Sequence, residues 1–255
     1  PASDGQRVFL VEDKDPLGMG TRSGFVGGFI PMGGRKPAGD WNRLASYSLQ
    51  TGRPDWEIGG MRMNEPFDLP LAGTRFLGAP VPVDGQLFVV GERNNEIRLH
   101  VLEAATGRPA WSRRVAYSDG QVLPGFDRRY ASSHVAVSDG IAVCPTTVGW
   151  LVGIECSSRR TLWAYRYASP LPEEPSRRGM VMRVPGRGPT TIDSHWAAAP
   201  PVISGERLVF SSPSEPVLVC LDLFSGRKLW QRPRGSSLYV AGCFGDKLLL
   251  VGADA

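Results

Sequence analysis

The sequence predicts an all-β chain in which one small antiparallel sheet recurs several times. Two observations lead to this prediction. The chain contains 31 glycines and 22 prolines among many short Val- and Leu-rich runs, a composition typical of short strands joined by frequent turns. Four segments also repeat one eleven-residue pattern that ends in tryptophan, and such internal repetition is the signature of a repeat architecture.

The eleven-residue pattern places a turn at its sixth and seventh positions and a tryptophan at its end. Its copies are SYSLQTGRPDW, VLEAATGRPAW, GIECSSRRTLW and CLDLFSGRKLW. The third position is usually acidic, but the first copy has Ser48. The seventh position is glycine except for Arg159, so we expect the turn of the third copy to be strained or altered. The repeated turn glycines and tryptophans are Gly52, Gly107, Gly226, Trp56, Trp111, Trp163 and Trp230.

A second element precedes each copy, namely a turn with glycine followed by a β-rich run. Glycine suits a tight turn because it accepts a positive φ, and the apolar run behind it is typical of a strand buried on both faces. A fifth such element, FGDKLLLVGA, follows the last copy, so the sequence predicts the first strand of a fifth sheet. The turn glycines are Gly5, Gly85, Gly140, Gly205 and Gly245.

The repeated tryptophan predicts how the sheets pack. A small sheet cannot bury both of its faces alone, and a large aromatic side chain suits the seam between two neighbouring sheets. We therefore expect all four tryptophans to be largely buried at equivalent positions, each as a wedge between sheets. Repeated acids at the third position (Glu103, Glu155 and Asp222) indicate a turn-stabilising role, since side-chain oxygens there can bond free backbone N–H groups.

The pattern small-x-acid-x-x-Thr-Gly-x-x-x-Trp resembles the tryptophan-docking motif of the PQQ-like (quinoprotein-type) β-propeller repeat family. The resemblance covers essentially the whole chain and implies a propeller of four-stranded antiparallel blades. The Gly-His and Trp-Asp signatures of WD40 propellers are absent. PQQ-like rings resemble seven- or eight-bladed closures, so four blades and part of a fifth imply about half a ring, and we expect the chain to be a piece of something longer.

The repeat divides the chain into one continuous propeller segment, 1–255. Its blade units are 1–75, 76–130, 131–195 and 196–238, followed by a partial unit, 239–255. Two Gly- and Pro-rich excursions, 13–42 and 168–195, interrupt this spacing. We expect both to lack regular core packing.

Composition and charge exclude several classes of protein. The net charge is +4, and the arginines are scattered without a basic stripe, which argues against a nucleic-acid partner. No apolar stretch is long enough for a spanning helix, and the first residues show no signal peptide. Membrane association is therefore expected only through segments outside this sequence.

The four cysteines show neither metal-ligand nor haem-attachment spacing. Cys144, Cys156, Cys220 and Cys243 lie in or beside apolar runs, which favours buried thiols. Their even number keeps disulfides in an oxidising compartment as an open alternative.

One candidate site follows from the repeat. Ten residues before successive strand glycines stand Arg75, Tyr130 and His195, and equivalent positions of a propeller lie near the mouth of its central channel. These three residues are a candidate channel lining for an anionic or polar ligand. The alternative is an ordinary polar loop lip.

The resemblance also raises the question of PQQ-dependent alcohol or sugar oxidation. Family members that hold PQQ with calcium carry adjacent cysteines and a Glu/Asn/Asp calcium set, and this sequence has no Cys-Cys pair. The histidines show no metal-ligand spacing, and 185–191 lacks the Lys-Ser/Thr of a P-loop. We therefore expect no catalytic residue, metal or cofactor in this chain.

Two functions remain open on the sequence alone. The first is a non-catalytic scaffold or binding propeller of the bacterial cell envelope, similar to the outer-membrane assembly lipoprotein or to extracytoplasmic sensor domains. Its expected partner is another protein or further blades of the same chain. The alternative is a fragment of a PQQ-dependent quinoprotein dehydrogenase.

Overall fold

Short antiparallel strands and tight turns make up the computed structural model of this protein. The structure describes residues 1–12, 41–61, 68–118, 133–167, 200–211 and 217–252. Among these residues there is no helix, and hence none that is long and apolar enough to cross a membrane. The two excursions predicted within 13–42 and 168–195 lie outside the described residues, except for positions 41 and 42.

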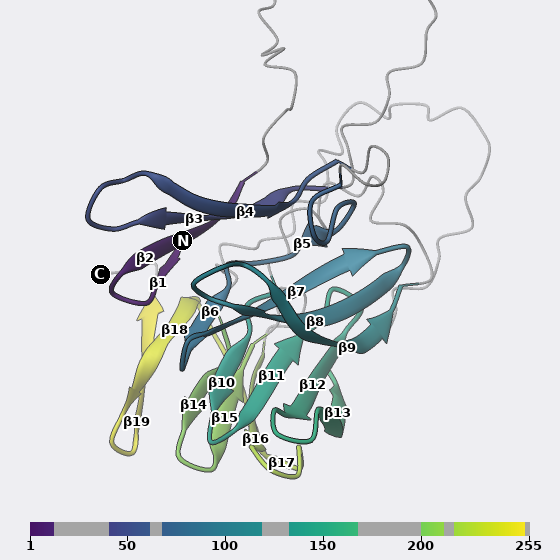
Figure 1. The fold of residues 1–255 in the computed structure, drawn as a ribbon. Coiled ribbons are helices and arrows are strands. Elements are labelled where there is room, and N and C mark those ends of the chain that lie inside the picture. Colours follow the sequence, from purple (N-terminus) through teal and green to yellow (C-terminus); the bar gives the residue numbers. More distant parts are fainter. Residues whose placement is uncertain (13–40, 62–67, 119–132, 168–199, 212–216, 253–255) are drawn as a thin grey trace, which may run out of the picture. The chain divides into compact units, whose positions relative to one another are not determined.

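The chain forms two compact units, Pro1–Arg129 and Tyr130–Ala255. The first unit contains two sheets, which Figure 1 shows in purple to blue. The first sheet has the order β1-β2-β3-β4, and in the second both β5 and β6 pair with β7, followed by β8 and β9. Their strands are β1 (Ala2–Ser3), β2 (Arg7–Glu12), β3 (Arg43–Ser48), β4 (Pro54–Gly59), β5 (Arg75–Phe76), β6 (Val81–Val83), β7 (Gln86–Arg93), β8 (Glu96–Glu103) and β9 (Pro109–Tyr117).

The second unit contains two four-stranded sheets and a hairpin, each in sequential order. The third sheet is β10-β11-β12-β13, the fourth is β14-β15-β16-β17, and β18 pairs with β19. Their strands are β10 (Ala136–Ser138), β11 (Ile141–Pro145), β12 (Trp150–Glu155), β13 (Arg160–Arg166), β14 (Val202–Ser204), β15 (Arg207–Phe210), β16 (Val217–Asp222), β17 (Lys228–Pro233), β18 (Ser237–Phe244) and β19 (Lys247–Gly252).

The strand order confirms the predicted all-β chain of antiparallel sheets, and three of the described sheets are four-stranded as expected. The second sheet has five strands, because β5 and β6 both pair with β7. The structure also corrects where each sheet begins in the sequence. A strand precedes each turn glycine: β1, β6, β10, β14 and β18 come before Gly5, Gly85, Gly140, Gly205 and Gly245. The apolar run behind the glycine is therefore the second strand of each sheet. The fifth unit accordingly contributes two strands, β18 and β19, where the sequence indicated one.

Burial follows position within each sheet. The middle strands are near-continuous apolar runs and are buried along most of their length, as in β11, where all five residues are buried. The last strand of each sheet is much more exposed, and every residue of β17 is exposed. Side chains on the fourth strands, and at the ends of the middle strands, are therefore the ones available to ligands and partners.

In the first unit the core lies between the first and second sheets. Phe9 and Leu44 from the first sheet pack with Leu87 and Leu102 from the second, all fully buried. Asn42, immediately before β3, adds a polar bridge between these sheets: its Nδ2 donates to the carbonyl oxygen of Phe76 at 2.9 Å, and the Phe76 N–H donates to Asn42 Oδ1 at 2.7 Å. The side chain thus forms the same pair of hydrogen bonds that a neighbouring strand would form.

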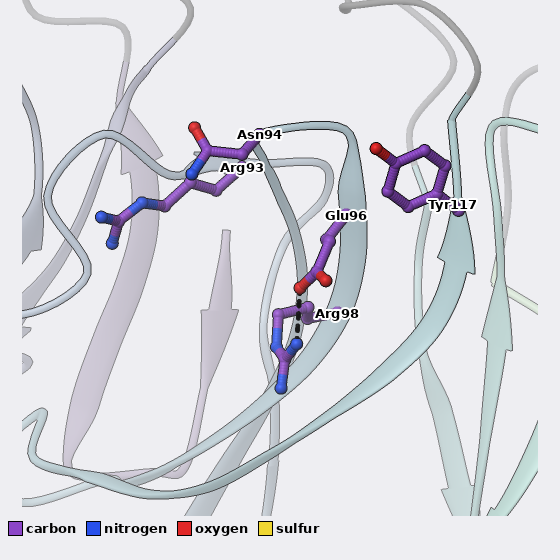
Figure 2. A pocket seen from close by; sticks show the side chains of 5 residues that line it. All are labelled: Arg93, Asn94, Glu96, Arg98 and Tyr117. Atoms are coloured by element: carbon purple, nitrogen blue, oxygen red, sulfur yellow. Dashed lines mark hydrogen bonds and ion pairs between the residues drawn. The ribbon is translucent and has the colours of Figure 1, made fainter.

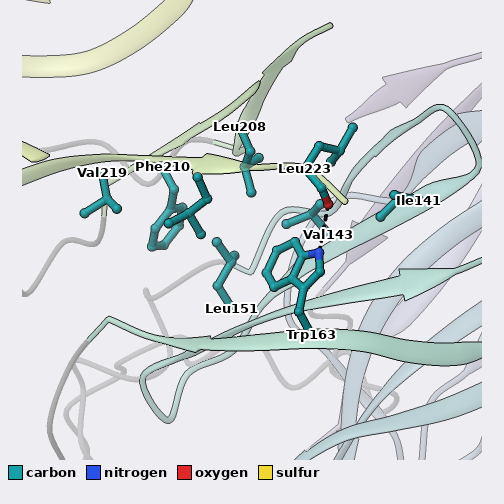
Figure 3. Packing of buried hydrophobic residues seen from close by; sticks show 9 residues of the cluster. Ile141, Val143, Leu151, Trp163, Leu208, Phe210, Val219 and Leu223 are labelled. Carbon is teal, nitrogen blue, oxygen red and sulfur yellow. Dashed lines mark hydrogen bonds between the residues drawn. The ribbon is translucent and has the colours of Figure 1, made fainter. Parts of the chain in front are cut away.

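In the second unit the middle strands of the fourth sheet, β15 and β16, are buried on both faces. Leu208 and Leu221 face a cluster that includes residues of the third sheet, and Figure 3 shows this cluster around Trp163. On the other face Cys220 and Leu218 pack with Val240 of the hairpin. Alternation along each strand explains this, since successive side chains point to opposite faces.

Candidate functional site

The predicted channel residues can be placed only in part. Arg75 lies in β5, half-buried, and pairs in register with Glu92 of β7. Tyr130 and His195 lie outside the described residues. A shared lining by these three side chains therefore stays a prediction.

In the first unit, one repeated tryptophan lies on the next sheet's turn. The Nε1 of Trp56, on β4, donates to the carbonyl oxygen of Ala104 at 3.0 Å. Gly107 completes the contact with a φ of 70°, and a Cβ on it would lie only 2.6 Å from the Trp56 ring. Glycine is needed here for two reasons, the left-handed backbone and the close approach of the indole.

In the second unit, Trp163 on β13 makes the same contact. Its Nε1 donates to the carbonyl oxygen of Leu223 at 2.8 Å (Figure 3), and a Cβ on Gly226 would lie 2.6 Å from its ring. Its own sheet also leaves room for the indole, because the cross-strand partner is Gly153. A Cβ on this glycine would lie only 2.2 Å from the indole. Trp163 is thus held between two glycines and is only 7% exposed.

The expectation that all four tryptophans are largely buried is wrong for Trp230. Trp56 and Trp111 are half-buried, whereas Trp230 is 36% exposed. Within the described residues, the Trp230 indole donates no hydrogen bond, and its cross-strand partner is Cys220 rather than a glycine. The shared position in the repeat therefore does not by itself determine burial.

The repeated acids brace their own turns, as predicted. Glu103 accepts a hydrogen bond from the Thr106 hydroxyl at 2.9 Å, Asp222 accepts from the Ser225 N–H at 2.8 Å, and Glu155 accepts from the Ser158 hydroxyl. A hydrogen bond from Arg108, followed by the one from Thr106, lowers the pKa of Glu103. The hydrogen bonds from Ser225 lower the pKa of Asp222. The turn of the third copy keeps its left-handed conformation at Arg159, with a φ of 60°, a strained value for a residue with a side chain.

All four cysteines are free thiols. Cys144 and Cys220 are fully buried, and burial raises the pKa of both. A raised pKa disfavours the reactive thiolate, so these side chains act as small apolar residues of the core.

The candidate site that the structure does show lies at one end of the second sheet. It is a depression of about 450 Å³ lined by Arg93, Asn94, Glu96, Arg98 and Tyr117 (Figure 2). The register of β7, β8 and β9 explains the arrangement. Arg93 pairs with Glu96, and Glu96 pairs with Tyr117, so these side chains form a row on one face of the sheet.

A second row of arginines lies beside the first. Arg98 of β8 pairs in register with Arg114 of β9, and both guanidinium groups reach Glu96. The N–O distances are 2.6 Å from Arg98 and 3.4 Å from Arg114. The hydrogen bond from Arg98 is the main cause that lowers the pKa of Glu96, which keeps this carboxylate ionised at neutral pH.

The charges of Arg98 and Arg93 also affect a buried histidine of the same sheet, His100. His100, two residues along β8 from Arg98, is buried, and its pKa is lowered to about 4, first by burial and then by Arg98 and Arg93. Neutral His100 packs edge-on against Phe76, with ring centroids 6.5 Å apart. It is therefore a core residue.

This site is not identified from the sequence, because the arginines are scattered along it without a basic stripe. A usable signal was nonetheless present. Asn94 and Asn95 follow one another between two apolar runs, and both adopt a positive φ between β7 and β8. A two-residue turn of this kind fixes the register of its hairpin, and so places Arg93 opposite Glu96.

The depression presents charged and hydrogen-bonding side chains. It offers guanidinium groups, a carboxylate already bonded to two of them, a carboxamide and a phenol. In the part of the chain that the structure describes, no group of three His, Cys, Asp or Glu side chains is placed to hold a metal ion.

Two solved structures resemble this chain in fold. BamB from Moraxella catarrhalis matches with a TM-score of 0.54 and 16% identity over 85% of this chain and 56% of its own. Sqt1 from Saccharomyces cerevisiae matches with a TM-score of 0.51 and 10% identity over 83% of this chain and 51% of its own. The chain therefore spans little more than half the length of either protein. No curated protein sequence matches it.

A family model described as "Outer membrane protein assembly factor BamB" matches residues 40–184, which is more than half of the chain. The fold agrees with this match, since the four-stranded sheets that do not close on themselves fit part of a propeller. The chain belongs to this family of PQQ-like β-propeller proteins.

Proposed function

We propose that this chain is part of a non-catalytic propeller that binds other proteins. The observation that carries the proposal is the family match over residues 40–184, because the family description names an assembly factor. The depression on the second sheet supports it. Arginine and tyrosine are enriched at protein–protein interfaces, and both line this surface.

In this proposal the repeated tryptophans act as docking wedges that hold successive blades in a ring of seven or eight. The contacts of Trp56 with Ala104 and of Trp163 with Leu223 support the role. Trp111 and Trp230 take the same role in the complete ring. Arg75, Tyr130 and His195 line its channel, and the segment 1–255 is one continuous part of it.

The proposed location is the extracytoplasmic side of a bacterial cell envelope, where a factor for outer-membrane protein assembly acts. The proposed partner is another protein, or further blades of the propeller. Nucleic acid is not expected, because the net charge is only +4 and nucleic-acid binding uses concentrated basic surfaces.

The described residues do not fit a PQQ–calcium site. The acids that recur at one position of the repeat, Glu103, Glu155 and Asp222, are bonded to hydroxyl or N–H groups of their own turns. A calcium ion needs six to eight oxygen ligands, and among the described residues no three His, Cys, Asp or Glu side chains are grouped to hold a metal ion. No step of a dehydrogenase reaction is therefore assigned to these residues.

Reconstitution tests the proposal directly. The purified protein is incubated with PQQ and calcium, and dye reduction is followed with simple alcohols and with glucose. We expect no turnover above the heat-killed control. Turnover above that control would establish the alternative, a quinoprotein dehydrogenase fragment, and PQQ binding without turnover would leave the non-catalytic role intact.

A further inference from the structure

We propose that Arg93, Arg98, Arg114 and Tyr117 form a docking surface for an acidic segment of a partner protein, an inference that rests on the proposed binding function. The four side chains come from three adjacent strands and lie on one face at the same end of the second sheet. We call them the arginine–tyrosine surface.

The arginine–tyrosine surface carries more positive than negative charge. One carboxylate, that of Glu96, is bonded to Arg98 and Arg114. Arg93 pairs with Glu96 in register, but its guanidinium group points away from that carboxylate (Figure 2). Glu92, next to Arg93 on β7, is buried, and strand alternation directs it to the opposite face. Among the described residues, Arg93 makes no hydrogen bond or ion pair, and Arg114 reaches Glu96 only at 3.4 Å. The guanidinium groups of Arg93 and Arg114 can therefore donate hydrogen bonds to further carboxylates.

The contact between Arg98 and Glu96 shows which ligand chemistry the surface accommodates. At 2.6 Å it is a short, charge-assisted hydrogen bond to a carboxylate. In the proposal, carboxylates of the partner segment bond to Arg93 and to Arg114 separately, each through the same kind of charge-assisted hydrogen bond. A phosphate-rich polymer is disfavoured, because it would bring closely spaced charges against the fixed negative charge of Glu96.

Tyr117 favours a protein over a free anion. Its side chain is 58% exposed at the end of β9, beside a depression of about 450 Å³ that also exposes the Asn94 carboxamide (Figure 2). A tyrosine next to arginines provides apolar contact area together with a hydrogen-bonding group, the combination that dominates protein–protein hot spots. A small anion would use the arginines alone.

The test is the binding of a fluorescein-labelled peptide of alternating Glu and Ser, followed by fluorescence anisotropy at low salt with the full chain. Its counterpart with Gln in place of Glu is the peptide control. We expect the acidic peptide to bind about ten times more tightly than the Gln peptide. Arg93→Gln and Arg114→Gln are each expected to weaken binding about three- to ten-fold, and Tyr117→Ala to weaken it about three-fold.

The matched control is Arg113→Gln. Arg113 is the neighbour of Arg114 on β9, but it pairs in register with Leu99 and so lies on the opposite face. This variant removes the same charge and is expected to change affinity by less than about two-fold. Unchanged circular dichroism and unchanged unfolding midpoints establish that each variant is folded.

Three outcomes would overturn the proposal: no preference for the acidic over the Gln peptide, an equal loss in Arg113→Gln, or tighter Arg93-dependent binding of RNA or of phosphatidylglycerol vesicles. None of these involves oxidation, so they leave the non-catalytic role standing. Conversely, turnover with PQQ and calcium would reject the proposed function whatever the peptides show.

Discussion

Trp163 and Trp230 occupy the same position of the repeat in adjacent sheets, yet one is buried and the other is not. Trp163 is 7% exposed and Trp230 is 36% exposed. Trp163 lies against Gly153 of its own sheet and Gly226 of the next, and its indole N–H is bonded to Leu223. Trp230 has Cys220 as its cross-strand partner, and β17, which carries it, is exposed throughout.

The difference shows that burial of the repeated tryptophan depends on its two neighbours. A glycine beneath the ring lets the indole lie flat on its own sheet, and the turn of the next sheet covers it from above. Trp163 has both, whereas Cys220 places a side chain where Gly153 has none. The repeat therefore provides a tryptophan in each sheet. The residue beneath its ring and the turn that covers it determine how much the tryptophan contributes to the free energy of unfolding.

Replacing each tryptophan by alanine should give the largest difference between the two positions. Trp163→Ala is expected to lower the free energy of unfolding by about 4 kcal/mol, because a large, buried aromatic side chain is lost. Trp230→Ala is expected to cost about 1 kcal/mol or less. Urea denaturation with a common m-value measures both changes, and equal losses would show that the exposure of Trp230 does not persist in solution.

Two turn glycines, Gly226 and Gly52, allow the contribution of the Trp163 contact to be measured from the glycine that the indole touches. Gly226 and Gly52 have nearly the same positive φ, 67° and 69°. An added Cβ would meet the Trp163 ring at Gly226 but nothing within 4 Å at Gly52. Gly52→Ala is therefore expected to cost about 1 kcal/mol for the left-handed backbone alone, and Gly226→Ala about 2–3 kcal/mol.

Thermal or urea unfolding of the two glycine variants measures this difference. The variant pair holds the backbone cost nearly constant, so the excess at Gly226 reports the contact with the indole. Combining Gly226→Ala with Trp163→Ala should remove the excess, because the two residues are in direct contact. Full additivity in the double variant would argue against the contact.

A change of pH should alter overall stability without altering the difference between Trp163 and Trp230. The pKa of His100 is about 4 in the folded protein and 6.5 ordinarily. Since the folded pKa is lower, stability is complete above about pH 6.5 and falls towards about pH 4, as the unfolded chain takes up a proton that the folded chain excludes. Between about pH 7 and 5.5 the loss from His100 is about 1 kcal/mol.

Urea unfolding at both pH values, with His100→Gln as control, checks this prediction. Burial also lowers the pKa of His134, so the control should reduce the pH dependence without abolishing it. The carboxyl of Asp222, near Gly226, has a lowered pKa and stays ionised over this range. A pH-dependent difference between the two tryptophan variants would contradict the assignment.

Much of the fold was predictable because the repeat consists of residue types that favour particular backbone conformations or packing positions. Thr-Gly and Ser-Gly turns, strand glycines and the recurring tryptophan locate the hairpins, and the repeated acids identify themselves as turn braces at Glu103 and Asp222. The first strands were not separated from the turns, because runs such as Val81–Val83 and Val202–Ser204 are too short to show periodicity.

The site was less predictable for a different reason. Arg93, Glu96 and Tyr117 come together only through the register of three strands, and a bulge between Ile97 and Arg98 shifts that register. Bulges of this kind are set by the local fit of neighbouring strands rather than by residue type. The exposure of Trp230 was missed similarly, since it depends on what lies across the seam.

The Asn42 bridge makes one backbone amide a reporter of sheet separation. The Phe76 N–H belongs to β5 of the second sheet, yet it is bonded to Asn42 Oδ1 beside the first sheet. Its exchange with deuterated solvent therefore requires the two sheets to move apart, whereas most other strand amides exchange when their own sheet opens. The protection of this single proton measures how often the first two blades come apart while each remains folded.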